Sequence, residues 1–156
     1  MSDDERVERF WRAYAATLSS SEGEGADAYV AEQFGDSAEL ADELGALIVS
    51  GRKTATCSAV WEWEAEGKAM PAVGLKTVVL DGRGAPLCVI ETTGVVVVPF
   101  DEVGADFARE EGEGDLSLAY WREAHWRFFK RTLPKIGREA DSKMPLVCER
   151  FRLVYK

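Results

Sequence analysis

The residues of this chain with the clearest capacity for chemistry lie in one short segment, Gly51-Arg52-Lys53-Thr54-Ala55-Thr56. A lysine amine beside a threonine hydroxyl can act as the base that activates the hydroxyl as a nucleophile, provided that burial lowers the pKa of the amine. The same pattern also describes a solvated turn lysine that is followed by β-forming threonines. The choice depends on the elements that position Lys53 and Thr56.

A helix over 36–50 and a strand that opens after it are predicted on either side of this segment. The apolar positions before it recur at helical spacing: Leu40, Leu44, Leu47 and Ile48. Asp36 is expected as the N-cap, with Glu39 three residues later, and Gly51 is expected in the left-handed conformation just after the helix. Lys53 is thereby placed on a turn next to two hydroxyl groups.

Several stretches of the chain resemble one known family. The central segment looks like the G-x-K-x-x-T signature of ASCH domains, which have a PUA-like β-barrel fold. Further stretches resemble a bacterial branch of about this length: Phe34-Gly35-Asp36, Glu91-Thr92-Thr93, 110–115, Tyr120-Trp121-Arg122 and Cys148-Glu149-Arg150-Phe151. The resemblance covers nearly the whole chain. It implies an α+β fold, a small, mostly antiparallel PUA-like (ASCH) β-barrel flanked by helices.

The resemblance also implies candidate catalytic residues. The family includes amidohydrolases that act on acetylated cytidine, for which a lysine, a threonine and a glutamate are the proposed catalytic set. These carry over onto Lys53, Thr56 and Glu111, where the glutamate is matched by an Ala-x-x-Glu context, and a shift of one position onto Glu110 stays open. In this reading Thr56 attacks the acyl carbon after Lys53 takes its proton, and Glu111 protonates the leaving amine.

The candidate substrate-binding residues are Trp61, Trp63, Glu91, Tyr120 and Arg122. The aromatic residues could stack on a nucleobase, and the two tryptophans could equally cap the open end of the barrel. Tyr120 and Arg122 point in different directions on their helix, so at most one reaches a given pocket. Glu91, on a predicted strand, either serves the site or pairs with a core arginine.

Three other acidic or titratable positions have two interpretations each. The acidic stretch 110–115 is either a solvated surface or a loop whose glycines let it fold onto a ligand, in which case Glu111 converges on the pocket of Lys53 and Thr56. His125 lies on an apolar helix face, and the interpretation as a packed core histidine is favoured over that of a catalyst. Glu149 interrupts the apolar side of the last strand, and an ion pair with a neighbouring arginine is its default explanation.

Length and composition indicate one soluble domain over residues 1–156. The chain has 156 residues of which 46% are hydrophobic, an N-terminal helix is expected over 4–18 to pack on the barrel, and 19–25 is expected to be a short loop. No apolar run is long enough to span a bilayer and the N-terminus is charged, so a cytoplasmic protein without a membrane partner is expected. Three widely spaced cysteines and a single histidine favour buried thiols, and neither a metal nor another cofactor is expected.

The net charge of −9 bears on the partner. Tight nucleic-acid binding needs a basic patch, so a small nucleoside-like ligand is the first expectation and DNA is not expected. An RNA-binding module or ribonuclease is the second hypothesis, because one stretch is basic: Arg122, Arg127, Lys130, Arg131, Lys135 and Arg138. A third hypothesis is a non-catalytic ligand-binding domain that uses Lys53 only as a charge.

Overall fold

The computed structural model describes residues 1–18 and 28–156, so the loop expected over 19–25 lies outside the described residues. The elements follow in the order α1 (Asp3–Ala15), β1 (Val30–Gln33), α2 (Ala38–Val49), β2 (Ala55–Ala59), α3 (Val60–Glu66), β3 (Lys76–Leu80), β4 (Pro86–Pro99), η1 (Phe100–Glu102), α4 (Ala105–Glu111), α5 (Leu118–Thr132), η2 (Leu133–Ile136) and β5 (Pro145–Tyr155). None of the helices in the described ranges combines the length and the apolar character that crossing a membrane requires.

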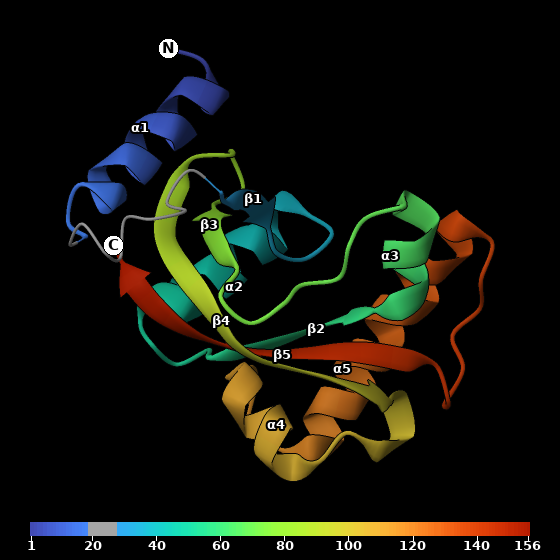
Figure 1. Ribbon diagram of the computed structural model, residues 1–156. Helices are drawn as coiled ribbons and strands as arrows, with labels where there is room; N and C mark the ends of the chain where they lie inside the picture. Colours follow the sequence, from blue (N-terminus) through green and yellow to red (C-terminus); the bar gives the residue numbers. More distant parts are fainter. Residues whose placement is uncertain (19–27) are drawn as a thin grey trace.

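The five strands form one curled sheet in the order β1-β3-β4-β5-β2 (Figure 1). All neighbouring pairs are antiparallel except β1 and β3. The sheet is a half-barrel, with β1 and β2 as its two edges. This is the α+β, PUA-like fold expected from the sequence, although the parallel edge strand β1 was not predicted.

The curl of the sheet comes mainly from β4. The sequence predicts two strands over 87–92 and 95–98, whereas the structure has one strand of 14 residues. Its pairing with β5 shifts register between Thr92 and Gly94. Such a bulge bends a strand and increases its twist, so the chain curves without breaking the ladder.

Helix α1 covers one side of the half-barrel (Figure 1). Ser2 caps it in a capping box with Glu5, where the sequence suggested an aspartate, and the helix ends at Ala15 instead of residue 18. The buried face consists of Val7, Trp11 and Tyr14, as the helical spacing of these residues predicts.

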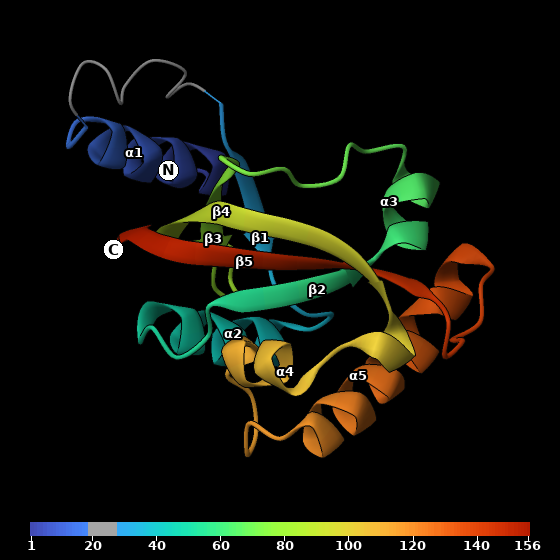
Figure 2. The ribbon, with the colours of Figure 1, turned by 60° about the horizontal axis from the view of Figure 1, so that its bottom comes forward.

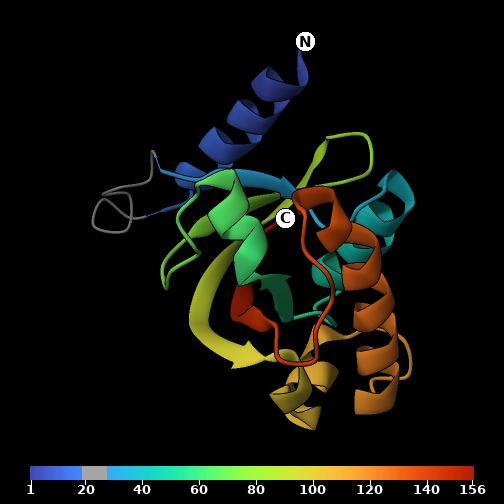
Figure 3. The ribbon, with the colours of Figure 1, turned by 90° about the vertical axis from the view of Figure 1, so that its right-hand side faces the viewer.

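Helices α2, α4 and α5 lie on the other side of the sheet (Figure 2). Ser37 caps α2, and the expected cap Asp36 instead pairs with Arg131 at 2.6 Å. The core beneath β2 and β5 contains Phe107 of α4 and Trp121 and Phe129 of α5. Helix α3, which continues directly from β2 and contains Trp61 and Trp63, lies at the same end of the molecule as η2 (Figure 3).

Candidate functional site

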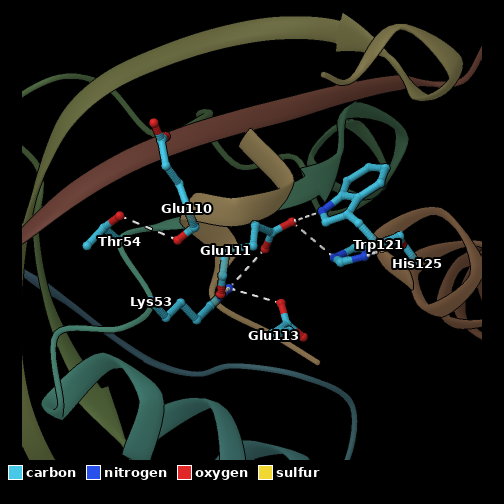
Figure 4. Close-up of polar contacts among 7 residues, drawn as sticks. All are labelled: Lys53, Thr54, Glu110, Glu111, Glu113, Trp121 and His125. Atoms are coloured by element: carbon cyan, nitrogen blue, oxygen red, sulfur yellow. Dashed lines mark hydrogen bonds and ion pairs between the residues drawn. The ribbon is translucent and has the colours of Figure 1, made fainter. Parts of the chain in front are cut away.

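Lys53 is a buried lysine, with 1% of its surface exposed. The backbone N–H groups of Arg52 and Lys53 both donate to the Leu47 carbonyl, which folds the chain inward after α2. The Lys53 ammonium Nζ lies 2.9 Å from Glu111 Oε1, 3.3 Å from Glu113 Oε2 and 3.4 Å from the Glu111 carbonyl oxygen (Figure 4). Its three protons are therefore all used by the acidic loop.

The acidic loop reaches Lys53 because its backbone packs directly on the turn before β2. The Thr54 N–H donates to the Glu110 carbonyl at 2.8 Å, and α4 ends at Gly112 in the left-handed conformation, φ +74°. A Cβ atom at Gly112 would lie 2.5 Å from the Arg52 carbonyl oxygen. Glycine is therefore required both by the backbone angle and by the close approach of the two segments.

Glu111 is a buried carboxylate with donors on both oxygens. Lys53 holds Oε1, while Oε2 accepts from the Trp121 indole N–H and lies 3.1 Å from His125 Nε2. The His125 Nδ1 atom lies 2.8 Å from the Trp121 carbonyl oxygen, and its ring stacks on Trp121 with centroids 4.3 Å apart. The Cys57 sulfur lies within 4.8 Å of a Glu111 carboxylate oxygen. His125, expected as a packed core residue, therefore contacts the candidate acid.

These contacts determine the charge state of the site. Burial alone would lower the pKa of Lys53, but the charges of Glu111 and Glu113 more than offset this, so that its pKa is raised. Burial would likewise raise the pKa of Glu111, but Lys53 and His125 hold it well below its usual range. The resting pair is thus an ammonium and a carboxylate, not the neutral amine that a lysine base requires.

The structure distinguishes Glu110 from Glu111. The Glu110 carboxylate points away from Lys53 (Figure 4) and pairs with Arg150 on β5. Of the two adjacent glutamates that the sequence left as alternatives, Glu111 is the one in contact with Lys53.

A cavity of about 690 Å³ lies against this cluster. Five of the sequence-predicted residues line it: Lys53, Thr56, Trp63, Glu111 and Tyr120. The Lys53 ammonium bonds to Glu111 and Glu113, so Lys53 and Thr56 line the same cavity without a hydrogen bond between them. The cavity is bounded by β1, α2, β2, α3, the acidic loop and α5.

Three predicted substrate-binding residues lie outside the lining of this cavity. Trp61 packs against the core, with the Arg138 guanidinium 4.6 Å above its ring. Glu91 pairs with Arg152 at 2.6 Å and Lys76 at 3.4 Å on the sheet surface, which is close to the arginine pairing weighed for it. Arg122 is exposed on the far side of its helix from the cavity-lining residues.

The cavity also contains functional candidates that sequence reasoning missed or explained differently. Glu149 accepts a hydrogen bond from Thr92 at 3.3 Å, while the arginine next to it pairs with Glu110. Burial, together with the nearby charge of Glu32, raises the pKa of Glu149 to about 7. Its position on the apolar side of β5 was a usable signal, whereas Glu32 lies on the strand that was not predicted.

One group of side chains in the cavity could hold a metal ion. A sulfur of Cys57, a carboxylate oxygen of Glu111 and a ring nitrogen of His125 all lie within 4.8 Å of one another. Sulfur, nitrogen and oxygen donors suit zinc. However, Glu111 already accepts bonds from Lys53, Trp121 and His125, so a metal would have to displace His125 from it.

The half-barrel with its flanking helices is that of a PUA-like domain, and comparison with known proteins identifies the family. The sequence model of the ASCH domain matches residues 30–155. The chain therefore belongs to the ASCH domain family.

Two solved structures are similar over nearly the whole chain. The ASCH domain from Lactobacillus crispatus JV V101 is 38% identical with a TM-score of 0.92, covering 97% of this chain and 96% of that one. Protein EF3133 from Enterococcus faecalis V583 is also 38% identical, with a TM-score of 0.84 and coverage of 97% and 89%. Among curated proteins no significant match was found.

Proposed function

We propose that this protein hydrolyses an amide-type bond in an acylated nucleoside or a similar small, base-bearing molecule. One observation carries the proposal: the buried Lys53–Glu111 pair lies against a cavity that Thr56 also lines. A nucleophile, a proton carrier and an ion-paired partner within one cavity are the groups that acyl transfer needs.

The charge and shape of the cavity favour an uncharged, planar ligand. Seven carboxylates line it, from Glu32, Glu43, Glu62, Glu66, Glu111, Glu113 and Glu149. Among the residues that the structure describes, four lysine and arginine side chains oppose them in this lining, from Lys53, Lys68, Arg127 and Arg131, together with the imidazole of His125. An excess of carboxylates repels phosphate, whereas the rings of Trp63 and Tyr120 offer stacking surfaces for a base.

Lys53 and Glu111 together hold the protons that transfer of the acyl group to Thr56 requires. Transfer of one proton along the 2.9 Å contact converts the ammonium of Lys53 and the carboxylate of Glu111 into an amine and a carboxylic acid. Lys53 then accepts the Thr56 proton while the Thr56 oxygen attacks the acyl carbon. When the C–N bond breaks, Glu111 donates its proton to the leaving amine. The pair is thereby returned to its resting charge state with an acyl ester on Thr56.

Release of the acyl group needs the same two residues with water in place of Thr56. The Glu111 carboxylate accepts a proton from the attacking water, and the Lys53 ammonium donates one to the departing Thr56 oxygen. A proton then passes from Glu111 back to Lys53. The products are the carboxylic acid, the free amine and the enzyme in its starting state.

Turnover of a panel of acylated nucleosides, including N4-acetylcytidine, tests the proposal. We expect Thr56→Ala and Glu111→Gln to abolish turnover and Thr56→Ser, which keeps a hydroxyl, to retain part of it. If Thr56→Ala turns over substrate at the wild-type rate, Thr56 is not the nucleophile. If Glu111→Gln keeps the wild-type rate at every pH, Glu111 is not the general acid. Binding of these compounds without any turnover would instead support the non-catalytic ligand-binding domain.

A further inference from the structure

Strand β2 lies at an edge of the sheet, so some of its residues direct their main-chain N–H and C=O groups toward β5 and the others direct them away from the sheet. Among the residues that the structure describes, it pairs with β5 alone. Just before β2, Phe151 donates its N–H at 3.0 Å to the carbonyl of Thr54, which lies directly opposite it, whereas the Thr54 N–H donates to Glu110. The single bond between opposite residues marks this pair as a hydrogen-bonded position of the ladder. Hydrogen-bonded and non-hydrogen-bonded positions alternate along an antiparallel ladder, so the main chains of Thr56 and Ser58 bond to β5. Ala55, Cys57 and Ala59 therefore direct their N–H and C=O groups away from the sheet.

Of these three residues, only Cys57 is accessible to solvent or to a ligand in the cavity. Ala55 and Ala59 are 0% exposed, whereas Cys57 is partly exposed and lines the cavity. Its side chain packs against the core, where burial raises the pKa of the thiol well above its usual value. The N–H and C=O of Cys57 are therefore the polar groups that this residue directs toward the free edge.

The cavity meets this free edge of β2. Successive residues of a strand point to opposite faces of a sheet, yet Thr56 and Cys57 both line the same cavity. Glu149, which lies opposite Thr56 on β5, and Glu111, with a carboxylate oxygen within 4.8 Å of the Cys57 sulfur, both line the cavity as well. The cavity therefore lies along the strand edge, where the main chain of Cys57 borders it.

We propose that the main-chain N–H and C=O of Cys57 bind the hydrogen-bonding edge of a nucleobase. Within one strand residue these two groups point the same way, side by side, and form a paired donor and acceptor. Nucleobases present donors and acceptors side by side on their edges, and enzymes that take up single bases read them in this manner between stacking side chains. Aromatic rings for stacking line the same cavity: Phe34, Trp63, Tyr120 and Phe128.

The excess of carboxylates in the lining selects a neutral heterocycle over an anionic one. Binding of a base at Cys57 does not depend on the proposed hydrolysis; only the placement of the reacting acyl group next to Thr56 rests on the proposed function. A base held at Cys57 places its substituent beside the adjacent Thr56.

Proline at position 57 tests the donor, because proline lacks an N–H and is tolerated in an edge strand where that N–H faces away from the sheet. Cys57→Pro is compared with Cys57→Ala, so that loss of the thiol is common to both variants. We expect Cys57→Pro to bind cytidine and uridine about tenfold more weakly than Cys57→Ala, as one lost hydrogen bond implies. Equal affinities in the two variants, measured by calorimetry on folded protein, overturn the inference.

A second test changes the ligand and needs no variant. Methylation at N3 blocks the edge of uridine, whereas methylation at C5 leaves it free, and both compounds are uncharged. We expect wild-type protein to bind 3-methyluridine at least tenfold more weakly than 5-methyluridine. Equal binding of the two compounds, or no binding of any unmodified nucleoside, overturns the inference. Nucleoside binding without turnover of acylated nucleosides overturns only the proposed function.

Discussion

Glu111 is an ionised carboxylate in the protein interior, where a charge is stable only if it is paired and hydrogen-bonded. Lys53, Trp121 and His125 supply the donors, and their arrangement leaves the Lys53 ammonium facing the cavity beside Glu113. The chemistry proposed for the pair and the stability of the fold therefore depend on the same contacts. Loss of activity in a Lys53 variant has to be separated from loss of structure.

Replacing Lys53 by methionine is expected to destabilise the protein by about 3 kcal/mol, because it leaves the buried Glu111 charge without its main partner. Denaturant unfolding measures this change. Adding Glu111→Gln to the Lys53→Met variant is expected to restore part of the lost stability, since no buried charge then remains unpaired. Lys143→Met, which breaks an exposed pair with Asp101, is the control and is expected to change stability little.

The raised pKa of Glu149 predicts a pH-dependent stability. Burial and Glu32 raise its pKa from 4.5 to about 7, so the folded protein keeps a proton that the unfolded chain has released in this range. The free energy of unfolding should therefore fall as pH rises from about 4.5 to about 7. Relative to Glu149→Gln, which cannot titrate, the wild type should lose roughly 3 kcal/mol across this window. Parallel profiles for the two proteins in denaturant unfolding would contradict the assignment.

At the scale of elements, the site is made where the C-terminal end of α4 meets the turn between α2 and β2. The contact is backbone to backbone, through the Thr54–Glu110 hydrogen bond and the close approach of Gly112 to Arg52. Such a contact holds Glu111 relative to Lys53 more rigidly than two long side chains could by themselves. A side chain at position 112 would force the two elements apart.

Gly112→Ala is expected to destabilise the fold and to reduce turnover together, because its Cβ would overlap the Arg52 carbonyl while the backbone adopts a positive φ. Gly137→Ala is a matched control: its φ is +75° but nothing lies within 4 Å of its Cβ. The control should lose about 1 kcal/mol from backbone strain and keep its activity. Equal losses of stability in both variants, measured by denaturant unfolding, would show that the close approach to Arg52 contributes nothing.

At the scale of the whole molecule, the net charge of −9 and the acidic lining of the cavity act in the same direction. A neutral nucleoside releases few counterions when it binds, so its affinity should change little as salt is raised to about 200 mM. RNA held by Arg122, Arg127 and Lys130 would instead lose affinity by orders of magnitude over that range. Titrations of a nucleoside and of single-stranded RNA at several salt concentrations separate the two hypotheses, and tight, steeply salt-dependent RNA binding would favour the second.

Much of the fold could be predicted from the sequence, because it follows from local patterns. Helical spacing identified the buried face of α1, and the glycines over 82–84 identified the hairpin between β3 and β4. The caps were assigned one residue or more away, since Ser2 and Ser37 competed with adjacent aspartates that serve the same purpose. The short strand β1 was missed because its pairing with β3 joins segments far apart in the sequence.

For the site, the sequence alone pointed to Lys53, Thr56 and Glu111 through their resemblance to a family motif, and the placement of all three around one cavity depended on the tertiary structure. Only the fold could exclude Glu110, because adjacent residues at the end of a helix point in different directions. The protonation states of Lys53 and Glu111 also depend on the fold. Burial lowers the pKa of Lys53 and a nearby carboxylate raises it, and which effect is larger depends on distances that only the tertiary structure determines. The same is true of the free edge at Cys57, because which backbone groups a strand leaves unpaired is determined by its neighbours in the sheet, not by its own residues.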